Sequence, residues 1–121
     1  MSYLPGHSHD TASTRDAATQ QVQRMQTAID TAVSQLPAFI RHDIDSTHMA
    51  QAMTRAVRSY FEQEHTVGSD CRPHSDAARL LQTVLDDLMG CGAGHLAGRC
   101  DGDYVRRTMK RIAREYGTQM A

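Results

Sequence analysis

The sequence predicts an all-α fold, a single-domain four-helix bundle, and three observations lead to this prediction. The 121 residues suffice for one domain but not for two of ordinary size. Aromatic residues make up 5% of the chain and there is no tryptophan, so the core must be built mainly from aliphatic side chains and methionine. That mixture suits helix packing better than a β-sandwich. Apolar residues also recur at helical spacing, and no strand-like alternation extends beyond a few residues.

Residues 1–12 are polar and are predicted to form a disordered leader before a helical domain that spans residues 13–121. The first helix is expected to begin near Ser13 and to end near Leu36, because Pro37 disfavours a helical conformation of the residue before it. Pro37 then suits the first position of a short helical turn. The apolar stripe of the first helix consists of Ala18, Val22, Met25, Ile29, Val33 and Leu36.

A second helix is expected to begin with Ser46 as its N-cap and to end by His65. Its apolar stripe consists of Met49, Met53, Ala56, Val57 and Tyr60. Glu62 and Glu64, near its end, are interpreted as ordinary solvent-facing residues. The following segment, residues 66–74, contains a glycine and a proline and is predicted to be a loop.

Ser75 is the expected N-cap of a third helix, with Asp76 in its first turn, where a carboxylate interacts favourably with the helix dipole. Apolar residues cover about half of its circumference, so this helix is expected to be the most buried. These residues are Ala77, Leu80, Leu81, Val84, Leu85, Leu88 and Met89. Gly90 is expected to end the helix, which makes the glycine-rich stretch up to Cys100 a connector.

The fourth helix is expected to begin at Asp101 or Asp103 and to end at Gly117. On a helical wheel, an apolar side lies opposite a basic face, and this face is the predicted partner-binding surface. The basic face consists of Arg106, Arg107, Lys110, Arg111 and Arg114. Five cations on one face suit either an acidic protein surface or the phosphates of a nucleic acid. About ten residues separate Gly90 from Asp101, which departs from the short turn of a helix-turn-helix motif.

Two Cys/His clusters flank the third helix, and only one of them is predicted to be able to bind a metal locally. Cys71 and His74 precede the helix, and a helix of about fifteen residues, roughly 22 Å long, separates them from the second cluster. The candidate zinc ligands are therefore Cys91, His95 and Cys100. A fourth ligand would come from Asp101, Asp103, His42 or His48.

The favoured interpretation of the same stretch involves neither cofactor nor metal, with its cysteines acting as small buried apolar residues. A Cys91–Cys100 disulfide is a further alternative. No catalytic residue is predicted. A nucleophilic pair of Cys91 and His95 would lack a third group to orient it, and the glycines lack the Lys-Ser/Thr that follows in a phosphate-binding loop.

The net charge of −1 gives no affinity of the whole chain for polyanions, and only residues 101–121 are net basic, with five cations against three carboxylates. No secretory signal or membrane-spanning stretch is recognised. Lys110 is the sole lysine among the 13 basic residues, and such a preference for arginine is usual in proteins from GC-rich bacterial genomes. We therefore expect a small, non-enzymatic bacterial interaction or regulatory protein of the cytoplasm, whose last helix docks an acidic partner. One alternative is a nucleic-acid-binding regulator that acts as a homodimer. Another is a small zinc-stabilised or Cys/His-dependent protein.

Overall fold

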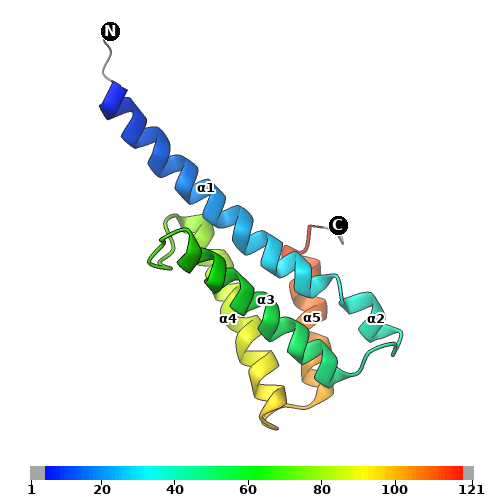
Figure 1. Ribbon diagram of the computed structural model, residues 1–121. Helices are drawn as coiled ribbons and strands as arrows, with labels where there is room; N and C mark the ends of the chain where they lie inside the picture. Colours follow the sequence, from blue (N-terminus) through cyan, green and yellow to red (C-terminus); the bar gives the residue numbers. More distant parts are fainter. Residues whose placement is uncertain (1–4, 119–121) are drawn as a thin grey trace.

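The computed structural model describes the backbone of residues 5–118 and the side chains of residues 16–118. These residues contain no strand and form four long helices and one short helix: α1 (Pro5–Val33), α2 (Leu36–Ile40), α3 (Ser46–Thr66), α4 (Asp76–Leu96) and α5 (Gly102–Tyr116). The long helices alternate in direction and pack into a bundle, as Figure 1 shows. The predicted all-α four-helix bundle is thereby confirmed.

The first helix begins at Pro5, earlier than the predicted start near Ser13. Proline suits the first position of a helix, and no glycine or proline follows Gly6 within α1. The N-terminal part of α1 extends past the ends of the other long helices (Figure 1). Residues 1–4 of the predicted leader lie outside the described residues.

The break after α1 and the start of α3 lie close to their predicted positions. Pro37 occupies the first turn of α2, as its fixed backbone angle favours. The N-cap of α3 is Asp45 and not Ser46, because Asp45 has the extended backbone of a cap and its Oδ1 accepts a hydrogen bond from the backbone N–H of His48 at 2.8 Å. Ser46 is already the first residue of the helix.

The predicted end of the third helix is wrong, because α4 continues through Gly90 to Leu96. A glycine ends a helix by adopting a positive φ, and within the described chain only Gly68 and Gly98 do so among the glycines. At Gly98 (φ 79°) the backbone N–H groups of Gly98 and Arg99 donate to the carbonyls of His95 and Gly94. The link to α5 is therefore residues 97–101 only, about half of the predicted length.

Both remaining caps agree with their predictions. Ser75 Oγ accepts from the N–H of Ala78 at 3.1 Å, and Asp101 Oδ1 accepts from the N–H of Tyr104 at 2.9 Å. Gly117 is the C-cap of α5.

The core lies where the stripes of all the helices meet, and α4 packs against α1, α3 and α5. Among its larger members are Met25, Ile29, Phe39, Met49, Met53, Val57, Tyr60, Leu81, Leu85, Leu88, Met109 and Ile112. Leu80 departs from the prediction, because 53% of it is exposed. No described helix combines the length and the apolar character that crossing a membrane requires.

Candidate functional site

One of the five cations on the basic face of α5, Arg106, packs against another helix of the bundle. Arg106 is half-buried, and its guanidinium lies 5.4 Å from the centre of the Phe39 ring on α2, within the range of a cation–π contact. This contact joins the first half of α5 to the short helix. Arg106, one of the predicted partner-binding residues, is thus already engaged in packing between helices.

The more exposed cations of α5 have acidic neighbours of their own. Arg107 Nε lies 3.5 Å from Asp103 Oδ2, and Arg111 Nη2 lies 3.3 Å from Asp87 Oδ2 on α4. Arg114 Nη2 lies 3.6 Å from Glu115 Oε2. Exposed pairs of this kind contribute about 0–1 kcal/mol each, so they can be exchanged for other carboxylates at little cost.

Lys110 differs from its neighbours on α5. It is exposed, and no salt bridge to it occurs among the residues whose side chains are described. The outer surface of α5 therefore combines one free ammonium group with arginines that are loosely paired.

The predicted metal ligands, Cys91, His95 and Cys100, make packing and hydrogen-bond contacts between α4, α5 and the link that joins them. Cys91 is buried against α5, where Thr108 hydrogen-bonds its thiol. His95 Nδ1 lies 2.8 Å from the carbonyl oxygen of Cys100, and so helps to close the link between α4 and α5. Within residues 16–118 no three His, Cys, Asp or Glu side chains are grouped so that they could hold a metal ion. The structure thus does not assemble Cys91, His95 and Cys100 as a ligand set.

The three cysteines are free thiols, so the alternative Cys91–Cys100 disulfide is not formed. Cys100 Sγ packs beside Gly94, where a Cβ would come within 2.8 Å of it. Cys71 lies at the other end of α4, in the loop that follows α3 (Figure 1). The two Cys/His clusters are separated by the length of α4, as expected.

Burial raises the pKa of the Cys91 thiol, although the hydrogen bond from Thr108 opposes this effect. We therefore expect Cys91 to react with iodoacetamide at pH 8 more slowly than Cys71 or Cys100, which are half-buried. Mass spectrometry of the alkylated native protein would give the three rates. If Cys91 reacted first, it would be an activated nucleophile, and the Cys/His-dependent alternative would gain its catalytic group.

A buried polar cluster at the α3–α4 end of the bundle was not predicted. Glu64, expected to face solvent, is 0% exposed, and its Oε1 accepts a hydrogen bond from Arg24 Nε on α1. Tyr60, one helical turn earlier, is 1% exposed. Desolvation by burial and then the charge of Glu64 raise the pKa of Tyr60 to about 12. Tyr60 Oη and Glu64 Oε2 lack hydrogen-bond partners among the described protein atoms.

Gln21, one turn before Arg24 on α1, connects α1 to the loop between α3 and α4. Its Nε2 donates to the carbonyl oxygen of Arg72 at 2.8 Å, and its Oε1 accepts from the N–H of His74 at 2.9 Å. Since Gln21 is itself fully buried, these two bonds satisfy a side chain that could not otherwise be placed in the core. Gln21 therefore anchors this loop on α1.

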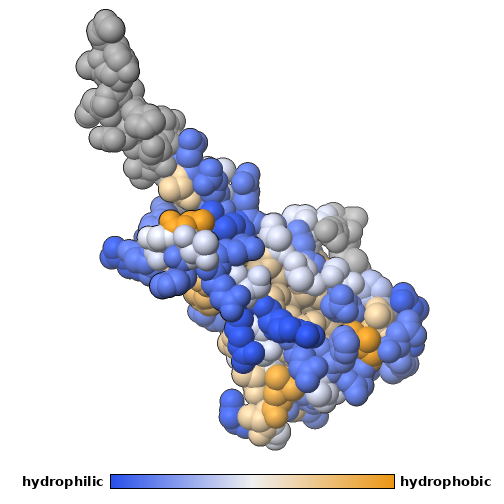
Figure 2. Space-filling model, viewed as in Figure 1, coloured by the Kyte–Doolittle hydropathy of each residue, from blue (hydrophilic) through white to orange (hydrophobic). Residues whose placement is uncertain are grey.

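A long groove follows the outer side of the contact between α1 and α3. It consists of three adjoining cavities of about 380, 50 and 430 Å³, and Ser59 lines all three. Small side chains from both helices line it, including Thr27, Ala28, Thr31, Ala52, Ala56 and Ser59. Figure 2 shows this face, on which a band of intermediate hydropathy runs between strongly hydrophilic patches.

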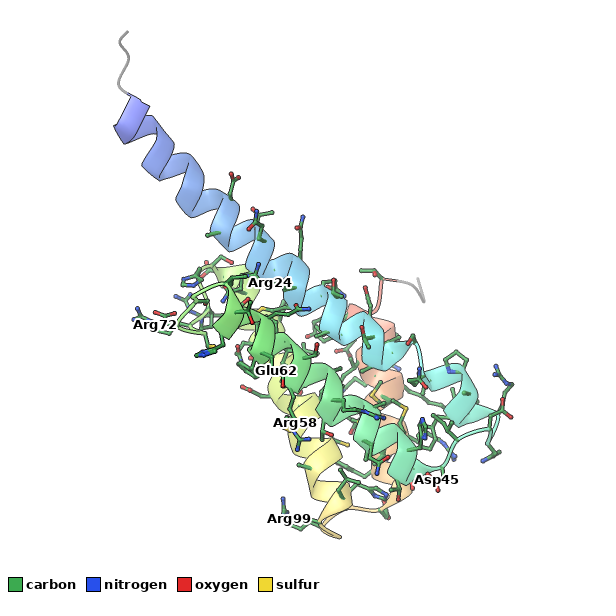
Figure 3. The ribbon with its side chains drawn as sticks, viewed as in Figure 1. Arg24, Asp45, Arg58, Glu62, Arg72 and Arg99 are labelled. Atoms are coloured by element: carbon green, nitrogen blue, oxygen red, sulfur yellow. The ribbon has the colours of Figure 1, made fainter. Side chains whose placement is uncertain are left out.

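Arg55 of α3 lines the cavity of about 380 Å³ in this groove, whereas Arg58, about one turn further along α3, lines none of the three cavities. Both are exposed, and within the described side chains neither forms a salt bridge. Figure 3 shows Arg24 between α1 and α3, and Arg58 and Glu62 on α3. The sequence gives no sign of this site, because it does not show which side of α3 remains uncovered.

Comparison with known proteins finds no matching family, no matching curated protein and no matching solved structure. The outer face of α5 and the groove between α1 and α3 each present an exposed cation that forms no salt bridge to a described residue, namely Lys110 and Arg55.

Proposed function

We propose that the protein is a small, non-enzymatic bacterial interaction or regulatory protein of the cytoplasm that docks an acidic surface of another protein through α5. The observation that carries this proposal is the state of the α5 cations. Lys110 has no salt bridge to any described residue, and Arg107 and Arg114 are about 70% exposed in pairs longer than 3.4 Å. A partner's carboxylates can replace Asp103 and Glu115 at little cost, since exposed pairs are weak.

The rigidity of α5 also supports docking. Its apolar side is fixed in the core by Val105, Met109 and Ile112, each of which is 0% exposed. Because the helix is already folded and packed, its cations are presented without the entropic cost of ordering a segment on binding.

Nucleic acid is the competing partner. The link of residues 97–101 is closer to a helix-turn-helix connection than the sequence suggested. However, three carboxylates lie among the α5 cations, namely Asp87, Asp103 and Glu115. These would face the phosphate backbone and repel it, whereas a protein surface of mixed charge can accommodate them.

The test uses a triple variant, Arg107→Ala, Lys110→Ala and Arg114→Ala, in which no changed residue is buried. We expect immobilised wild-type protein to capture one partner that the triple variant does not capture. The control variant, Arg72→Ala with Arg79→Ala and Arg99→Ala, changes three exposed arginines elsewhere and should retain the partner. Circular dichroism would verify that both variants remain helical.

Two results would contradict the proposal. Equal capture by the wild type and the triple variant would exclude the basic face of α5 as the docking surface. Retention of a short DNA duplex at low salt, lost on adding salt and in the triple variant, would favour the nucleic-acid alternative.

A further inference from the structure

We propose that the groove between α1 and α3 binds an acidic α-helix of another protein. This surface shares no lining residue with α5, so the inference does not depend on the docking role proposed for that helix.

The dimensions of the groove suit a helix. Its lining runs from His48 on α3 to Val67, the C-cap of that helix, which at about 1.5 Å per residue corresponds to a length of roughly 28 Å. A helix of about 20 residues has the same length. Because Ser59 borders all three cavities, they form one continuous depression and not three isolated pits.

The floor of the groove permits close approach of another helix. Ala28 and Ala56 close the bottom and are 7% and 4% exposed, whereas Ala52 is partly exposed at the side. Ser59 and Thr31 add short hydroxyl side chains. Small residues along a contact let helix axes lie near one another, and an amphipathic helix lying in a groove is a common mode of recognition.

The charge of the groove determines the character of the occupant. The cavity of about 380 Å³ has Arg55 in its lining and no carboxylate. Arg55 is exposed, and no described carboxylate forms a salt bridge with it. The lining carboxylate at the opposite end is Glu62. The α5 arginines, in contrast, already have acidic neighbours. The unpaired Arg55 therefore favours a helix that carries Asp or Glu along one edge.

Two copies of the chain packed symmetrically through this groove would repel each other. Such a contact would set Arg55 of one copy near Arg55 of the other, and like charges at a contact oppose association. The acidic helix is therefore assigned to a different protein, and a dimer is an outcome of the test below.

The experiment uses a fluorescein-labelled helical peptide of about 20 residues with Ala and Leu on one face and Glu on the other. A peptide of the same composition with a scrambled order serves as its control. Fluorescence anisotropy against the full chain should give a micromolar Kd for the patterned peptide. The scrambled peptide should bind about tenfold more weakly.

Two variants test the position of binding. Ser59→Trp places a large side chain at the border that the three cavities share, and Ser59 is exposed, so the fold should tolerate the change. Arg55→Glu reverses the charge of the unpaired cation in the groove. Each should weaken peptide binding by about tenfold or more. The matched controls are Thr83→Trp on the exposed face of α4 and Arg99→Glu beyond its end, which should leave the Kd within about twofold.

Several outcomes would overturn the inference. These are the absence of peptide binding, an unchanged Kd for Ser59→Trp, or a DNA duplex that binds through Arg55. A dimer in native mass spectrometry that Ser59→Trp dissociates would identify a second copy as the occupant. If the α5 triple variant lost the peptide while Ser59→Trp retained it, the groove proposal would fail and docking through α5 would be supported.

Discussion

Replacing Arg24 with alanine should lower the free energy of unfolding by about 3 kcal/mol, because it leaves the buried Glu64 carboxylate without its ion-pair partner. Glu64 is 0% exposed, and its Oε2 already lacks a hydrogen-bond partner among the described protein atoms. The loss should lie at the lower end of the range for broken buried pairs, since the Arg24 side chain is 22% exposed and water can enter its place.

Urea denaturation of the wild type and the variant would measure this loss. The matched control is Arg79→Ala, whose pair with Asp76 is exposed and should contribute less than about 1 kcal/mol. Adding Glu64→Leu to Arg24→Ala should restore most of the stability, because the buried charge is then absent as well. If Arg24→Ala cost no more than the control, Glu64 would be reached by solvent and the buried cluster would not exist in solution.

The position of Glu64 in the sequence indicates its burial, although its charge does not. Glu64 follows Tyr60 by four residues and therefore continues the predicted stripe of α3. Gln21 precedes Met25 by four residues in the same way and continues the stripe of α1. Both positions are buried in the structure. The charge of Glu64 predicts a solvent-exposed side chain, whereas its helical position predicts a buried one. The ion pair with Arg24 on α1 allows the buried position.

Local chemistry predicted most of the helix boundaries. Ser75, Asp101 and Pro37 act within one turn of their own position, so that the sequence alone determines their effect. The site was less predictable, because it depends on which helix faces meet. The wheel of α5 separates its basic face correctly, but does not show that Arg106 lies over Phe39 or that Arg111 meets Asp87.

The groove between α1 and α3 could not be predicted from sequence patterns. Arg55 falls on the polar side of the α3 stripe, as many solvated residues do. It is of interest because neighbouring small residues leave a depression that it lines and because no described carboxylate forms a salt bridge with it. Both facts belong to the packing of two helices distant in the chain.

Replacing Gly92 with alanine should lower the free energy of unfolding by about 1–3 kcal/mol, as overpacking of a close helix contact does. Its Cβ would lie 2.9 Å from the carbonyl oxygen of Ala50 and 2.9 Å from Thr54 Cγ2, so that α3 and α4 would have to separate. Backbone atoms of Ala50 cannot rotate away as the end of a long side chain can. Gly92 is therefore the residue that allows these two helices to approach.

Gly90→Ala is the matched comparison, two residues earlier in the same helix. A Cβ at Gly90 would meet no atom within 4 Å, and alanine favours a helix over glycine by about 0.5–1 kcal/mol. We therefore expect Gly90→Ala to raise the free energy of unfolding, with both variants measured by urea denaturation. The pair also distinguishes a continuous α4 from the predicted connector. Had Gly90 ended the helix with a positive φ, alanine there would be strained and would destabilise the fold, and Gly92→Ala would then lack a helix contact to disrupt.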